Sequence, residues 1–194
     1  MIKWDLNCGT LEFDEDLHIY ILNGIVIPSV SQIVNKLFPN KYADIPKWVL
    51  EMAAQKGIAV HEAIEMYEKA GELSSLPELQ GYIDLKKKEC FECVFNEKPI
   101  IVFVNGNPIC AGRLDMVTKQ EVSYGIEDIK RTQVVDEERL FLQLNLYAIG
   151  AEQIYGITAS YLKCLHLREK VAERIDIELN KQKTIQKIKE ILEC

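Results

Sequence analysis

Long apolar runs are absent from this chain. No stretch approaches the ~20 consecutive apolar residues needed to cross a bilayer, and residues 1–5 lack the charged and apolar regions of a signal peptide. We therefore expect a cytoplasmic protein with no membrane partner. The chain also has no glycine-rich phosphate loop, so it offers no support for an ATP-driven function.

Linkers rich in proline, glycine or serine are absent as well. The 194 residues, 48% of them hydrophobic, can bury a substantial core. No internal repeat or low-complexity segment divides the chain. We therefore expect a single domain over residues 1–194.

Basic residues are scarce relative to acidic ones. The 23 lysines and arginines stand against 30 acids, which gives a formal net charge of −7 at pH 7. This balance disfavours binding of nucleic acid through a large basic surface, because lysine and arginine contacts to phosphate supply most non-specific affinity. Acids gathered around a metal ion would account for part of the excess, since a bound cation reverses the local sign. The lysine run 86–88 is either a solvated helix face or a track for phosphates.

Only one pair of cysteines, Cys90 and Cys93, has a ligand-like spacing. The six cysteines of the chain suit a reducing compartment. We predict that Cys90 and Cys93 fall inside a helix, where core packing explains them better than zinc.

The expected elements run from helices to strands. Asn23-Gly24 between apolar runs predicts an N-terminal β-hairpin over residues 17–28. Ser29 or Ser31 can then cap a short helix through Leu37, and Pro39-Asn40 would stop it. The other expected elements are helices over 45–68, which Gly57 can interrupt, and 75–95; strands over 99–104, 109–117 and 122–130; a helix over 136–155; strands over 160–166 and 171–179; and a helix over 181–192.

This order predicts an α/β fold with a mixed central β-sheet flanked by helices. Residues 1–95 would form the hairpin and the helical N-terminal part. Residues 96–194 would form the sheet, a crossover helix and a C-terminal helix.

Two acids and a lysine fall on neighbouring predicted strands. Asp128 and Lys130 are two residues apart in a strand, so their side chains share a face. Asp115 lies in the preceding strand, and the polar residues 118–121 are short enough to form the turn between the two. The carboxylates suit Mg²⁺, and the lysine would offset negative charge on a phosphate or an attacking water. A solvent-facing hairpin with salt-bridged acids explains the same residues.

Two predicted helices add polar residues at spacings of four. Gln143 and Tyr147 lie together on one helix edge. Gly57, His61 and Glu65 share a face of an earlier helix, where a neutral imidazole can bind a metal and a nearby carboxylate can fix its tautomer. A zinc-peptidase motif is excluded, because it needs a second histidine where Glu65 stands.

Four motifs thus follow one another along the chain: Gly57-x-x-x-His61-x-x-x-Glu65, Gly112-x-x-Asp115, Asp128-x-Lys130 and Gln143-x-x-x-Tyr147. In this order and on these element types they resemble the PD-(D/E)xK nuclease superfamily, in particular its RecB-like branch of phage-type exonucleases. The resemblance covers roughly residues 25–165 and implies a restriction-endonuclease-like core. Some RecB-like nucleases carry an iron-sulfur cluster, but the C-terminal region here offers only Cys164 and Cys194, so no cluster is expected.

The resemblance also implies a role for each site residue. The carboxylates of Asp115 and Asp128, the imidazole of His61 and the main-chain carbonyl of Ile129 would bind one or two Mg²⁺ or Mn²⁺ ions. Lys130 would orient the attacking water. The remaining assignments are Gln143 and Tyr147 beside the nucleophile and a neighbouring phosphate, Glu65 and Glu97 as supports of the ligands, and Arg113, Arg131, Thr132 and Lys56 as contacts to nucleic acid.

The implied activity is a metal-dependent DNA exonuclease that hydrolyses phosphodiester bonds in phage or bacterial recombination or repair. Its partner would be DNA that is single-stranded or has a free end, with recombination or single-strand-binding proteins as further partners. The alternatives are a structure-selective endonuclease and a catalytically silent nucleic-acid-binding module on the same fold. We also expect the N-terminal lysines to lie on helices that arch over the site: Lys36, Lys41, Lys47 and Lys56.

Overall fold

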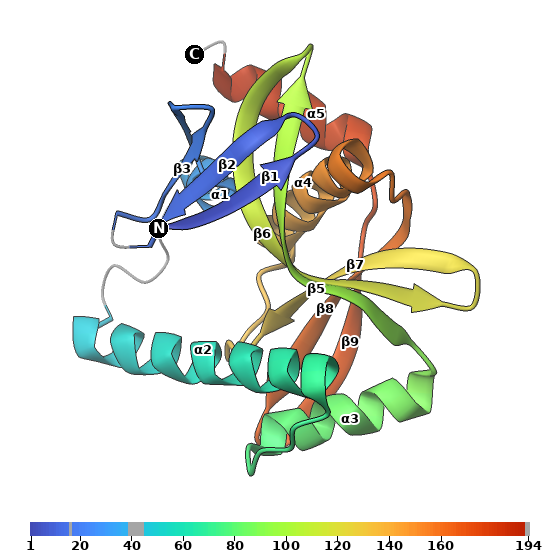
Figure 1. The fold of residues 1–194 in the computed structure, drawn as a ribbon. Helices are drawn as coiled ribbons and strands as arrows, with labels where there is room; N and C mark the ends of the chain where they lie inside the picture. Colours follow the sequence, from blue (N-terminus) through green and yellow to red (C-terminus); the bar gives the residue numbers. More distant parts are fainter. Residues whose placement is uncertain (16, 39–44, 193–194) are drawn as a thin grey trace.

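The computed structural model describes residues 1–15, 17–38 and 45–192, which form two β-sheets and five helices (Figure 1). The predicted α/β class with a mixed sheet is confirmed. In this described part of the chain, no helix combines the length and the apolar character that crossing a membrane requires. The predicted helix end at Pro39-Asn40, and Lys41, lie outside the described residues.

A four-stranded antiparallel sheet opens the chain. Its order is β1-β2-β3-β4, with bounds Ile2–Leu6, Gly9–Asp14, Ile19–Leu22 and Ile25–Ile27. The predicted Asn23-Gly24 turn is confirmed, since φ is 50° at Asn23 and 84° at Gly24. The sequence prediction covered only the hairpin of β3 and β4 and missed the first two strands.

The main sheet has five strands in the order in which they occur in the chain. They are β5 (Glu92–Val104), β6 (Asn107–Gln120), β7 (Ser123–Lys130), β8 (Ala159–Arg168) and β9 (Val171–Ile177). All neighbouring pairs are antiparallel except β7 and β8, which are parallel. A parallel pair needs a crossover, and α4 (Glu137–Tyr155) supplies it.

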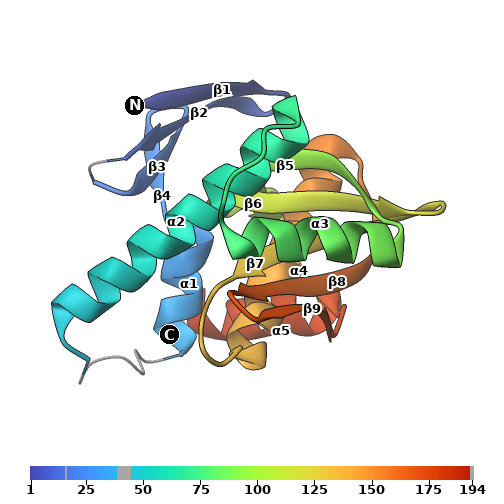
Figure 2. The ribbon, with the colours of Figure 1, turned by 90° about the horizontal axis from the view of Figure 1, so that it is seen from below.

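Helices cover both faces of the main sheet (Figure 2). One apolar cluster joins the sheet to α1 (Val30–Leu37), α4 and α5 (Lys181–Leu192), and a second joins it to α2 (Lys47–Ala70) and α3 (Pro77–Glu89). Alternate residues of β7 enter the two clusters, since Ile126 belongs to the first and Ile129 to the second. β7 is therefore buried on both faces.

A third apolar cluster joins the two sheets. Leu11 and Tyr20 of the N-terminal sheet pack there with Ile101 and Ala111 of the main sheet. The junction is also bonded through the backbone, because the amide of Ala111 donates to the carbonyl of Pro28 at 2.9 Å. The N-terminal sheet is thus fixed beside the middle of β6.

Helix α1 begins at this junction, where the sequence predicted a serine cap. The hydroxyl of Ser29 accepts a hydrogen bond from the amide of Gln32 at 3.1 Å, and the Gln32 side chain accepts one from the Ser29 amide at 2.9 Å. This reciprocal capping box satisfies two amides that have no partner inside the helix. The cap at Ser29 is confirmed.

The predicted helix over residues 75–95 is wrong at its C-terminal end. Helix α3 ends at Glu89, and Cys90 takes a left-handed backbone conformation with φ 53°. Cys93 lies in strand β5, so the two cysteines do not share a helix as predicted. Cys93 is half-buried, and its thiol donates to the carbonyl of Phe95 at 3.4 Å.

Two smaller expectations are also wrong. The predicted polar turn over residues 118–121 belongs mostly to β6, and the chain reverses at Glu121 and Val122. Helix α2 is continuous through Gly57, where the sequence allowed an interruption.

A fully buried ion pair joins β7 to β9. The carboxylate of Glu127 accepts hydrogen bonds from the guanidinium of Arg174, with 3.2 Å to Nε and a shorter contact to Nη2, and Thr118 donates to it at 2.6 Å. Neither charged side chain is exposed. Arg174 also lies over the ring of Phe91, 4.1 Å from its centroid. All of these groups lie on the face of the sheet opposite Asp128.

Replacement of Arg174 by leucine should therefore lower the free energy of unfolding by ~3–5 kcal/mol, because it leaves the Glu127 carboxylate buried and unpaired. Urea denaturation measures the change. Asp176→Asn is the matched control, since it breaks an ion pair of Lys163 in which the acid is 83% exposed, and it should cost less than ~1 kcal/mol. Equal losses in the two variants would contradict this account.

Candidate metal centre

The candidate centre lies where β6 and β7 stop pairing. Their registered pairs run from Gln120 and Ser123 to Met116 and Glu127. One residue beyond, the Asp115 carboxylate accepts a hydrogen bond from the amide of Ile129 at 2.7 Å. A side chain thus satisfies a strand amide that is buried. The strands can separate here without an unpaired backbone donor.

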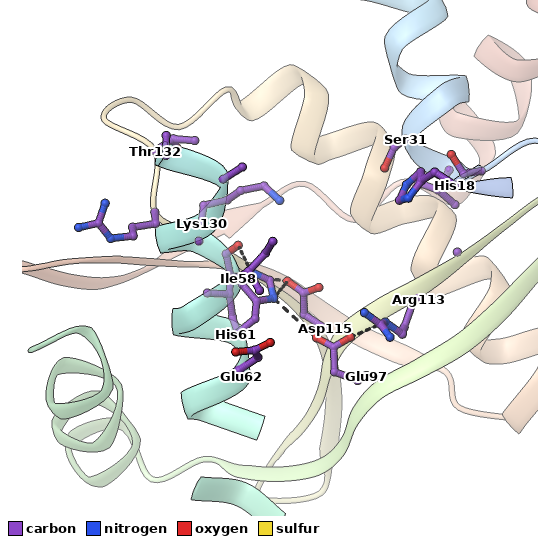
Figure 3. A pocket seen from close by; sticks show the side chains of 18 of the residues that line it. His18, Ser31, Ile58, His61, Glu62, Glu97, Arg113, Asp115, Lys130 and Thr132 are labelled. Atoms are coloured by element: carbon purple, nitrogen blue, oxygen red, sulfur yellow. Dashed lines mark hydrogen bonds and ion pairs between the residues drawn. The ribbon is translucent and has the colours of Figure 1, made fainter. Parts of the chain in front are cut away.

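Helix α2 brings His61 to this point. Its neighbours Val60 and Ile64 are buried in the second apolar cluster, which also contains Ile129. The Nε2 atom of His61 lies 3.2 Å from the carbonyl oxygen of Ile129. Its Nδ1 atom faces two carboxylates, at 3.6 Å from Glu97 Oε1 and 3.7 Å from Asp115 Oδ2 (Figure 3).

His61, Glu97 and Asp115 form a compact three-residue cluster. Each offers one ligand atom, and these atoms all lie within 4.8 Å of one another. Glu97 comes from β5, where its backbone has a positive φ of 54° that side chains rarely adopt. Arg113 holds the other oxygen of Glu97 at 2.6 Å. The sequence predicted a supporting role for Glu97, whereas the geometry places it among the clustered groups.

The charge of the cluster is reflected in the pKa of His61. Burial alone would lower this pKa, but the carboxylates of Asp115, Glu97 and Asp128 outweigh burial and raise it to about 9. At neutral pH the imidazole is therefore protonated and offsets the acids. A metal ion would take over this role, because metal binding requires the neutral imidazole and releases its proton.

Asp128 and Lys130 lie beside the cluster on one face of β7, as predicted. The Lys130 ammonium forms a close ion pair with Asp128 Oδ2, and Gln143 donates to Oδ1 at 2.8 Å. Burial raises the pKa of Asp128, although Lys130 counteracts this effect. Gln143 also donates to the phenol oxygen of Tyr147 at 3.3 Å. The predicted pair on α4 is thus joined to the acids.

The donor set fits a divalent cation. The carboxylates and the main-chain carbonyl of Ile129 are the oxygen ligands that Mg²⁺ and Mn²⁺ prefer, and one imidazole is compatible with them. Asp128 Oδ2 is buried and meets no donor in hydrogen-bond geometry, although the Lys130 charge lies close to it. A buried carboxylate oxygen with an unused lone pair is suited to a cation. The residues that would hold one are His61, Glu97 and Asp115, with Asp128 beside them. The Ile129 carbonyl, which was predicted as a ligand, contacts Nε2 of His61, whereas the carboxylates face Nδ1.

Several predicted residues lie elsewhere or are already paired. Glu65 borders the cavity but forms an ion pair with Lys69, and among the described residues no side-chain hydrogen bond or ion pair joins it to His61. The guanidinium of Arg131 donates to the buried Glu78 at 2.7 Å, which makes it a structural tie as well as a candidate nucleic-acid contact. Lys56 is exposed on α2 and does not border the cavity.

Three of the four predicted contacts to nucleic acid border the cavity: Arg113, Arg131 and Thr132. Thr132 is held through its carbonyl, which lies 2.8 Å from His166 Nε2. Arg113 is 43% exposed, so its guanidinium can reach a ligand while it is paired with Glu97.

A cavity of about 1020 Å³ opens above the cluster. One face of α2 borders it, and β2, β3 and the start of α1 border it from other sides. Gly112 permits a close approach on this side, because a Cβ there would lie only 3.0 Å from the Tyr147 ring and 3.1 Å from Val30.

The sequence prediction did not find the contribution of the N-terminal sheet. Phe13, His18 and Tyr20 all border the cavity. The alternation of apolar and polar residues in Gly9–Asp14 was the available signal for the strand that carries Phe13. No local pattern connects that strand to residues 115–130.

The comparisons with known proteins leave the identity of the chain open. No family model matches it, and no curated protein matches it significantly. A solved structure described as "Crystal structure of SSO0001" is similar to 84% of this chain and 72% of its own, with 13% identity and a TM-score of 0.42. A likeness at that level carries no argument about fold or function.

Metal binding provides a direct test of the centre. Wild-type protein should bind Mn²⁺ in a titration followed by electron paramagnetic resonance, and chelation should reverse the binding. His61→Ala and Glu97→Gln should each weaken Mn²⁺ binding by about tenfold or more, because each removes one donor or its charge. Glu62→Gln is the matched control, since Glu62 borders the same cavity from α2 outside the cluster. Similar affinities in all four proteins would exclude the cluster as the metal site.

Proposed function

We propose that the chain is a metal-dependent deoxyribonuclease of the exonuclease type. One observation carries the proposal: His61, Glu97 and Asp115 converge beside the Asp128–Lys130 pair at the point where β6 and β7 separate. Carboxylates that suit Mg²⁺ next to a lysine are the groups that phosphodiester hydrolysis requires.

The fold supports assignment to the PD-(D/E)xK superfamily. Asp115 and Asp128 lie on adjacent antiparallel strands, and α4 crosses over from β7 to the parallel β8. Gln143 and Tyr147 lie on that crossover helix and contact the site, in agreement with the four-motif resemblance. Helices cover both faces of this sheet.

Each residue then has a defined task. His61, Glu97 and Asp115 would hold a Mg²⁺ or Mn²⁺ ion, which when bound would lower the pKa of a water and polarise the phosphate. Gln143 holds Asp128 in position through its 2.8 Å hydrogen bond. Lys130 is 29% exposed, so its ammonium can reach a substrate and offset charge that develops on the phosphate. Arg113 borders the same cavity and would contact an adjacent phosphate.

The shape of the cavity favours a strand that enters from an end. Helix α2 borders it on one side and the N-terminal sheet on another, so the substrate lies between two elements. Confinement of this kind raises the local concentration of a strand without long-range attraction. It therefore suits a protein whose net charge is −7.

Loss of the acid or the lysine should abolish activity and leave the fold intact. Asp128→Asn and Lys130→Ala should each reduce cleavage of end-labelled DNA by about 10³-fold or more, because the members of a catalytic unit act together. Thermal unfolding should show that both variants remain folded. Lys163→Ala, which removes a lysine paired with Asp176 on the edge of the sheet, should keep wild-type activity. Cleavage that survives in either site variant would contradict the assignment.

The shape of the DNA should decide between the two modes of cleavage. In Mg²⁺, linear single strands should be shortened progressively from an end, and closed circular single strands should persist. Efficient cutting of the circle would replace the exonuclease proposal with an endonuclease. Binding of both forms without cleavage in Mg²⁺ or Mn²⁺ would point to a catalytically silent module.

A further inference from the structure

Two sets of apolar and aromatic side chains border the cavity above the metal centre and form its walls. One is the α2 surface formed by Val49, Ala53 and Ile58, and the other is formed by Phe13, His18 and Tyr20 of the N-terminal sheet. The aromatic wall is outside the four motifs and has no part in the chemistry described above. It is nevertheless continuous with the site, since the same cavity contains both.

The aromatic wall is a rigid stack with one ring exposed. The rings of Phe13 and Tyr20 lie 4.6 Å apart with an interplanar angle of 31°, and both residues are buried against the third apolar cluster. The exposed His18 ring meets Phe13 edge to face at 5.2 Å. His18 has a positive φ of 53°, a conformation that is uncommon outside glycine.

The wall lies close to the metal centre on the side away from Lys130. Burial raises the pKa of Tyr20 to about 12, and the charges of Arg113 and Glu97 act on the same phenol. Tyr20 therefore stays protonated and borders the cavity near those two residues. Figure 3 shows His18 and Ser31 at one end of the cavity and Lys130 and Thr132 at the other.

The α2 wall leaves room for a flat ligand. Ala53, Ala54 and Gly57 face the cavity from α2, and a Cβ added to Gly57 would meet nothing within 4 Å. Because these side chains are small, the helix projects little into the cavity. Ser31 borders the cavity beside His18, where its hydroxyl can meet the polar edge of a ligand (Figure 3).

We propose that this part of the cavity binds one unpaired nucleobase of the DNA strand whose phosphate lies at the metal centre, with the base stacked on the exposed ring of His18, which Phe13 supports edge to face. The inference rests on the proposed nuclease function and specifies its substrate as single-stranded DNA. A nucleobase has two apolar faces and a polar edge, which match the two walls and the Ser31 hydroxyl. Bases in a duplex are already stacked and paired, so they cannot enter. Stacking on an aromatic side chain is tolerant of sequence, so the site accepts any base.

The experiment measures binding of oligodeoxythymidylates to the full chain by fluorescence anisotropy. Ca²⁺ replaces Mg²⁺ in the buffer, at a Ca²⁺ concentration where DNA cleavage is negligible. Each oligonucleotide carries one abasic nucleotide, and the position of this nucleotide is varied along the strand. Binding should weaken by about tenfold at one position and little elsewhere, because only one base enters the site. His18→Ala should weaken binding of the intact strand by a similar factor and abolish the difference at that position.

Two further variants make the test specific. Leu17→Ala changes the exposed neighbour of His18, which does not border the cavity, and should retain wild-type binding. Ala54→Phe should fill the space between the walls and weaken binding even where His18 is intact. Thermal unfolding checks that each variant is folded.

The outcomes separate this inference from the proposed function. Metal-dependent cleavage with equal binding of all abasic strands would overturn the base site and leave the nuclease assignment in place. A single sensitive position that depends on His18, in a protein that cleaves no DNA in Mg²⁺ or Mn²⁺, would support the base site and exclude the nuclease. Failure of wild-type protein to bind any of these strands would exclude the base site.

Discussion

The separation of β6 from β7 is the constraint on which the candidate site depends. Two antiparallel strands would normally continue to pair, but here the Asp115 carboxylate takes the hydrogen bond of the Ile129 amide. A buried amide without a partner would cost about 1–3 kcal/mol, so the fold itself favours this position of the carboxylate. The same arrangement leaves the Ile129 carbonyl facing His61. Sheet geometry and ligand geometry are therefore fixed by one side chain.

The consecutive acids Glu127 and Asp128 on β7 are both buried, but they have different partners and therefore different roles. Glu127 points to one face, where Arg174 and Thr118 satisfy its oxygens. Asp128 points to the other face, where one oxygen receives a hydrogen bond from Gln143 and the other forms a close ion pair with Lys130. Complete pairing away from the cavity explains Glu127 as part of the core. Asp128 is paired instead with a lysine that borders the cavity, and a buried acid with such a partner is typical of a functional site.

Short sequence patterns predicted much of the fold, whereas features that depend on contacts between distant residues were missed. The Asn23-Gly24 turn and the helical periodicity of α4 are visible in short segments of sequence, and both predictions are confirmed. The end of α3 was missed because Cys90 adopts the left-handed conformation that glycine usually marks. In the site, the motifs that contain His61 and Asp115 could be read along the chain. The position of Glu97 within the cluster could not be predicted from the sequence, because it depends on the positive φ of Glu97 and on the pairing of β5 with β6.

The uneven burial of α2 has a mechanical consequence. Its C-terminal half is anchored by Val60 and Ile64, whereas residues 47–56 pack little and are mostly exposed. Glycine lowers the resistance of a helix to bending. A bend of α2 at Gly57 would move residues 47–56 relative to the sheet and change the width of the cavity mouth. His61 would keep its place beside Ile129, because it belongs to the anchored half. The cavity mouth would thus change in width while His61, Glu97 and Asp115 keep their mutual positions.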